Sequence, residues 1–73
     1  MSNTTHQSLI ELFSVLDEII LGASHHTYAA ALVIRKGERN GAIGTILPAA
    51  EKLEAANALL RAILVLHRQE GAA

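Results

Sequence analysis

The sequence predicts an all-α protein, an antiparallel helical hairpin that self-associates into a four-helix bundle. Three observations lead to this prediction. Apolar residues recur at alternating spacings of three and four over most of the chain, which is the period of one helix face. Glycines concentrate near the middle of the chain, where they can separate two helices. The apolar fraction, 51% of 73 residues, is more than a hairpin of this length can enclose by itself.

The strongest helical pattern covers residues 45–69. Thr45 can cap this helix, because its hydroxyl can accept a hydrogen bond from an unpaired amide of the first turn. Pro48 falls within that first turn, where a missing N–H costs nothing. The expected inward stripe consists of Ile46, Ala49, Leu53, Ala56, Leu60, Ile63 and His67. Between residues 58 and 66 only Arg61 is polar, so this half of the helix must be covered on more than one side.

A first helix is expected over residues 5–36. Its stripe keeps one phase throughout and consists of Leu9, Leu12, Leu16, Ile19, Ala23, His26, Ala30 and Val33. A turn between two separate helices has no reason to preserve this phase, so the pattern favours one long helix, straight or kinked, through Gly22. The alternative is a three-helix unit with a break near Gly22–Ser24, because Gly22 could end one helix and Ser24 could cap the next. Both arrangements remain open.

Residues 37–44 are the expected loop between the helices. The segment reads GERNGAIG and contains three of the five glycines, together with the pair Asn40-Gly41, which is typical of turns. Gly37 is expected to end the first helix. The tail after Glu70 is expected to be disordered. The chain, residues 1–73, is therefore interpreted as a single small domain.

If the two helices fold onto each other, the sequence predicts which residues lie opposite one another and which apolar residues stay uncovered. Opposed residues in an antiparallel pair have numbers with a constant sum, and a sum of 79 pairs Leu16 with Ile63 and Ala23 with Ala56. Several apolar residues then flank the stripe, where a coiled coil of only two helices would carry charges. The expected self-association core is Leu16, Ile19, Ile20, Leu53, Leu59, Leu60, Ile63 and Leu64. Two hairpins packed as a four-helix bundle would cover these residues.

The charge pattern favours a protein partner. The net charge is −1, too close to neutral to indicate nucleic acid or an anionic membrane as the partner. One basic cluster, Arg35, Lys36 and Arg39, supports an alternative in which a dimer acts as a nucleic-acid-binding regulator. Neither predicted helix resembles the polar, basic recognition helix of a DNA reader. The primary expectation is an interaction protein of the scaffold, adaptor or inhibitor type, which binds itself as a homodimer or larger assembly and could bind another protein.

No catalytic residue, cofactor site or metal site is predicted, and the protein is not expected to be an enzyme. Histidine ligands on one helix face must be three or four positions apart. His25 and His26 are adjacent, and no histidine has a second histidine at the required spacing. A histidine-dependent metal-binding protein is the third alternative.

The location expected from the sequence is cytoplasmic. The chain has no cysteine and hence no disulfide or thiolate zinc site. It starts with MSNTTHQS, which lacks the basic segment and the following apolar block of a secretory signal. The longest apolar runs are interrupted by charges well before the roughly 18 residues that a membrane span needs.

Overall fold

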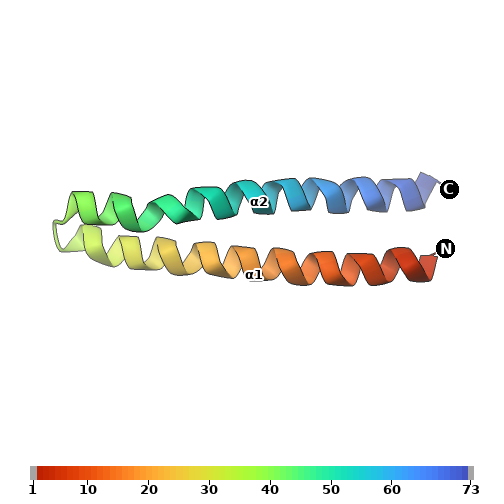
Figure 1. Ribbon diagram of the computed structural model, residues 1–73, viewed down its shortest axis with the longest axis horizontal. Helices are drawn as coiled ribbons and strands as arrows, with labels where there is room; N and C mark the ends of the chain where they lie inside the picture. The colour runs from red at the N-terminus through yellow and green to blue at the C-terminus, as the bar shows by residue number, and fades with distance from the viewer. Residues whose placement is uncertain (1, 73) are drawn as a thin grey trace.

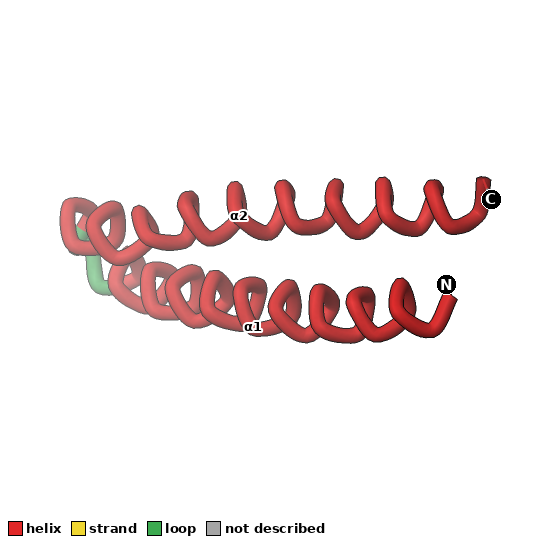
Figure 2. The backbone as a smooth tube through the Cα atoms, turned by 45° about the vertical axis from the view of Figure 1, so that its right-hand side comes forward, coloured by secondary structure: helices red, strands yellow, loops and turns green. Residues whose placement is uncertain are grey.

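The computed structural model describes residues 2–72, which form two α-helices joined by a short turn. Helix α1 (Ser2–Arg35) and helix α2 (Arg39–Ala72) run antiparallel, so both chain ends lie at the same end of the molecule (Figure 1). The helices stay side by side in both views (Figures 1 and 2). The molecule measures 55 × 15 × 13 Å along its principal axes, which makes it a rod. The prediction of an all-α helical hairpin is confirmed.

Helix α1 is continuous through Gly22–Ser24, so the three-helix alternative is wrong. Ser24 does not cap a new helix, because it lies inside α1, where its carbonyl oxygen accepts a hydrogen bond of 2.9 Å from Thr27 Oγ1. The stripe expected for this helix is its inward face, where Ala23 and Ala30 are buried and the other members are partly buried. Preserved apolar phase is therefore a reliable sign of a continuous helix in this chain.

Gly37 ends α1, as the sequence predicts. Its φ angle is +83°, in the left-handed region that costs a glycine nothing. The Gly37 amide donates to the Ile34 carbonyl at 2.9 Å, and the Glu38 amide donates to the Val33 carbonyl at 3.4 Å. These two bonds form a Schellman motif, which satisfies carbonyl groups at the end of the helix and reverses the chain at once.

Helix α2 begins at Arg39 rather than at Thr45, so the loop expected over residues 37–44 is wrong. Its glycines suggested a loop, because glycine costs an isolated helix about 1 kcal/mol relative to alanine. Tertiary packing gives Gly41 a different role. A Cβ atom at Gly41 would lie 3.2 Å from Val33 Cγ1, so the absence of a side chain lets the first turn of α2 approach α1 closely.

Thr45 and Pro48 consequently lie inside α2 instead of at its start. Thr45 Oγ1 donates to the Gly41 carbonyl at 2.8 Å, a bond within the helix and not a cap. Pro48 cannot donate the helical hydrogen bond to the carbonyl of Gly44, and Figure 1 shows α2 bending in this part of its length. At its other end α2 continues to Ala72, beyond the predicted helix end at residue 69.

The seam between the helices is lined mainly by alanine. Its buried residues are Ala23, Ala30, Ala42, Ala49, Ala56 and Ile63. Within residues 4–69, no large side chain is fully buried. Alanine lets two backbones approach closely but removes little apolar surface from water, and burial stabilises in proportion to that surface. The seam alone is therefore a weak source of stability for a chain of this size.

The register between the helices differs from the expected sum of 79. A Cβ atom at Gly22 would lie 3.4 Å from Lys52 Cδ, and one at Gly41 would lie 3.2 Å from Val33 Cγ1. The residue numbers in each of these pairs add up to 74, as do those of the last residue of α1 and the first residue of α2. The short turn explains the difference, because α2 starts earlier than the sequence suggests.

The stripe expected for α2 is only partly right. Three of its members are buried as expected, namely Ala49, Ala56 and Ile63. Leu53 and Leu60 instead face solvent, and the partly buried Lys52 and Leu59 take their places in the seam. Because residues 58–66 are apolar on nearly every side, helical periodicity alone does not select which side of α2 meets α1.

Replacing Gly37 with alanine is expected to lower the free energy of unfolding by about 1–2 kcal/mol, the cost of a left-handed conformation for a residue with a Cβ atom. Gly44 supplies the matched control, since it is helical and a Cβ atom added there would have nothing within 4 Å. Gly44→Ala should raise stability by about 0.5–1 kcal/mol. Urea titrations at one protein concentration, followed by circular dichroism, measure both changes. A Gly37→Ala variant as stable as the parent would contradict the cap.

Candidate interaction surface

Exposed apolar side chains gather on one side of the hairpin. Phe13 follows the seam residue Leu12 on α1, and Leu60 follows the seam residue Leu59 on α2. Because the helices are antiparallel and of the same hand, positions that directly follow the seam fall on the same side of the molecule. We call the set on this side the apolar side face: Ile10, Phe13, Ile20, Ile34, Ile43, Leu53, Leu60 and Leu64. Each of these side chains is between 42% and 55% exposed.

The apolar side face contains few polar positions. Asp17 lies between Phe13 and Ile20 at helical spacing, and its level on α2 is that of Asn57. Ser24 and Thr27 follow on α1 towards the turn. Asp17 is the only carboxylate among the described positions of this face, because Glu11, Glu18, Glu51 and Glu54 fall on other sides of their helices. Such a mixture of a large apolar area with a few polar groups is typical of a protein interface.

The molecule exposes more surface than a compact monomer of its mass. Its accessible surface is 5532 Å², whereas a compact protein of 7.8 kDa would expose about 4,400 Å². The excess is roughly 1,100 Å², and each partner in a standard protein interface loses about 800 Å². Although this surface is rich in apolar residues, neither described helix has a stretch that is long and apolar enough to cross a membrane.

The residues predicted as the self-association core divide into two groups. One group lies in the seam within a single chain and consists of Leu16, Ile19, Leu59 and Ile63. The other group lies on the apolar side face and consists of Ile20, Leu53, Leu60 and Leu64. The predicted core omitted four residues of the apolar side face, namely Ile10, Phe13, Ile34 and Ile43. Ile10 precedes Phe13 by three positions, a spacing that could have identified it.

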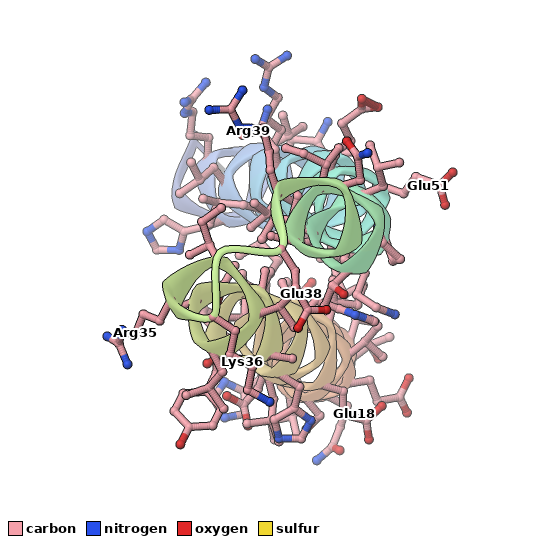
Figure 3. The ribbon with its side chains drawn as sticks, turned by 90° about the vertical axis from the view of Figure 1, so that its left-hand side faces the viewer. Glu18, Arg35, Lys36, Glu38, Arg39 and Glu51 are labelled. Carbon is pink, nitrogen blue, oxygen red and sulfur yellow. The ribbon has the colours of Figure 1, made fainter. Side chains whose placement is uncertain are left out.

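The three basic residues of the nucleic-acid alternative lie at the turn, and we call them the turn cations: Arg35, Lys36 and Arg39. Figure 3 views the molecule from this end and shows Arg35 and Arg39 extending away from each other, with Glu38 between Arg39 and Lys36. A phosphate backbone is bound by basic side chains that gather on one face. The geometry of the turn therefore does not favour nucleic acid as the partner.

The histidines are dispersed along the rod. His26 is partly buried in the seam, whereas His6, His25 and His67 are exposed. In the part of the chain that the structure describes, no three histidine or carboxylate side chains come close enough together to hold a metal ion. The apolar side face is therefore a better candidate for the functional surface than a metal site at the histidines.

No known protein family, curated protein or solved structure matches this chain. The functional assignment therefore depends on the geometry of the hairpin itself. The feature of the hairpin best suited to binding is the apolar side face, which can bind a partner by removing apolar surface from water. The few polar groups on that face can fix the orientation of whatever binds, because a buried polar group requires a hydrogen-bond partner.

Proposed function

We propose that this protein is a non-enzymatic interaction protein whose first partner is a second copy of itself. Two hairpins pack through their apolar side faces and form a four-helix bundle. The observation that carries this proposal is the concentration of eight large, half-exposed apolar side chains on one side of a hairpin whose own seam is mainly alanine. A helix pair that stood alone would carry charged residues at these flanking positions.

The size of the interface supports the proposal. Covering the exposed half of a leucine or isoleucine side chain contributes about 1 kcal/mol, and each copy brings seven such residues and Phe13 to the interface. Association itself costs about 4–15 kcal/mol. The excess surface of each hairpin also matches what a partner in a stable dimer must lose. Folding and association are then coupled, because the second copy supplies the apolar burial that the seam lacks.

The assembled bundle would keep an outer surface for other proteins. Leu21, Tyr28 and Leu47 are exposed on the outer sides of their helices, away from both the seam and the side face. Tyrosine and leucine on such a surface can anchor a protein partner, and tyrosine is enriched at interaction hot spots. This outer surface is where a scaffold or adaptor of this type would contact a further protein.

Sedimentation equilibrium at micromolar concentration tests the proposal, with an expected mass of twice the 7.8 kDa of one chain. The midpoint of thermal unfolding should also rise with protein concentration, because association stabilises only the folded state. A compact, helical single copy whose unfolding midpoint does not depend on concentration would contradict the proposal.

A further inference from the structure

We infer that the second copy lies end for end on the apolar side face, with the two turns at opposite ends of the bundle and the twofold axis near Ile20 and Leu53. This inference rests on the proposed self-association and specifies its geometry. It depends on the order of large, small and polar residues along the side face, together with the charge at the turn.

The side face is organised in rows across the two helices. Residues whose numbers add up to about 74 lie level, as the close approaches of Gly22 to Lys52 and of Gly41 to Val33 show. From the chain ends to the turn, the rows are Ile10 with Leu64, Phe13 with Leu60, Asp17 with Asn57, Ile20 with Leu53, Ser24 with Ala50, Thr27 with Ile46, Ala31 with Ile43, and Ile34 with Arg39. The large central row is therefore flanked by one polar row and one row of small residues.

Turning a second copy end for end about the Ile20 row brings unlike rows together. The Asp17 row then meets the Ser24 row of the partner, where hydroxyl groups can donate to the carboxylate. On α1, Phe13 then lies over Thr27 of the second copy and Ile10 lies over its Ala31, so large side chains meet small ones. On α2, Leu60 meets Ile46 and Leu64 meets Ile43, which are apolar on both sides. Close packing of this kind is what protein interiors require, and the face becomes complementary to itself, as a twofold interface must be.

The opposite orientation, with both turns at the same end, matches each row with its own copy. The two Asp17 carboxylates would then share one buried layer, where like charges raise the cost of desolvation. The row of Ser24 and Ala50 would meet the same small residues, and a gap there would lose packing. The turn cations of both copies would lie side by side. The end-for-end arrangement separates them by most of the 55 Å length of the rod, far beyond the screening length of about 8 Å at physiological salt.

Nitroxide labels at the turn measure the orientation directly. The chain has no cysteine, so Glu38→Cys introduces one unique labelling site in an otherwise intact protein. With a helical rise of 1.5 Å per residue, the end-for-end bundle places the two labels about 50 Å apart. Pulsed electron paramagnetic resonance on the dimer should report that distance. A distance below about 25 Å would place both turns at one end and overturn the inference.

Leu21→Cys provides the control for pairing itself. Leu21 lies on the outer side of α1, close to the level of the proposed axis. Across a four-helix bundle its two labels should be about 30 Å apart or closer in either orientation. Dipolar coupling at Leu21→Cys with a short distance at Glu38→Cys would overturn only the orientation. An absence of coupling in both variants would overturn the proposed self-association and, with it, this inference.

Discussion

The double substitution Leu53→Lys and Leu60→Lys is expected to convert the associated protein into single copies and to lower its helix content at micromolar concentration. Both leucines lie on the apolar side face, outside the seam of the hairpin. A lysine at either position would have to lose its hydration to enter the interface, and an unpaired buried charge costs several kcal/mol. Sedimentation equilibrium measures the loss of association, and circular dichroism measures the accompanying loss of helix.

A second double variant, Leu21→Lys with Leu47→Lys, is the matched control. It makes the same chemical change at two leucines that are at least as exposed but lie on the outer surface. This variant should keep its mass and its helix content. If both double variants lose association equally, association depends on the total exposed apolar surface and not on the side face. If the Leu53–Leu60 variant stays associated, the side face is not the interface.

Ile63→Ala is expected to lower the free energy of unfolding by about 2–5 kcal/mol, the usual cost of truncating a buried isoleucine. Ile63 is 3% exposed and is the one large side chain among the buried residues of the described seam. The loss should be near the upper end of this range if the neighbouring alanines cannot move into the space. Small domains have total stabilities near the bottom of the roughly 5–15 kcal/mol range, so the variant should be substantially unfolded when dilute. Urea titration at several protein concentrations measures the change.

Val65→Ala controls for the general effect of shortening an apolar residue on the same helix. Val65 is exposed and lies outside both the seam and the side face. Its substitution should change stability by no more than about 0.5 kcal/mol, as is usual for surface positions. Equal losses for Ile63→Ala and Val65→Ala would show that Ile63 does not anchor the seam.

The candidate interface illustrates how far sequence reasoning reaches in this chain. An excess of apolar residues beside each stripe was visible without a structure, and Ile20 and Leu64 were identified from it. Leu53 and Leu60 were instead expected in the inward stripe of the second helix. The sequence did not show which apolar residues of α2 lie in the seam and which lie outside it, because this helix is apolar on nearly every side over residues 58–66. Several rotations of such a helix bury similar amounts of apolar surface, and only contact with α1 distinguishes them.

By itself, the sequence determined that the chain is all-α and that Gly37 ends the first helix, and it favoured a first helix without a break at Gly22. These features depend on periodicity and on backbone conformation, which are local properties. Only the tertiary structure decided where α2 begins and which of its sides faces α1. Both depend on how closely the two backbones can approach. The contact of Gly41 with Val33 sets this distance, and the helix propensities of single residues do not contain that information.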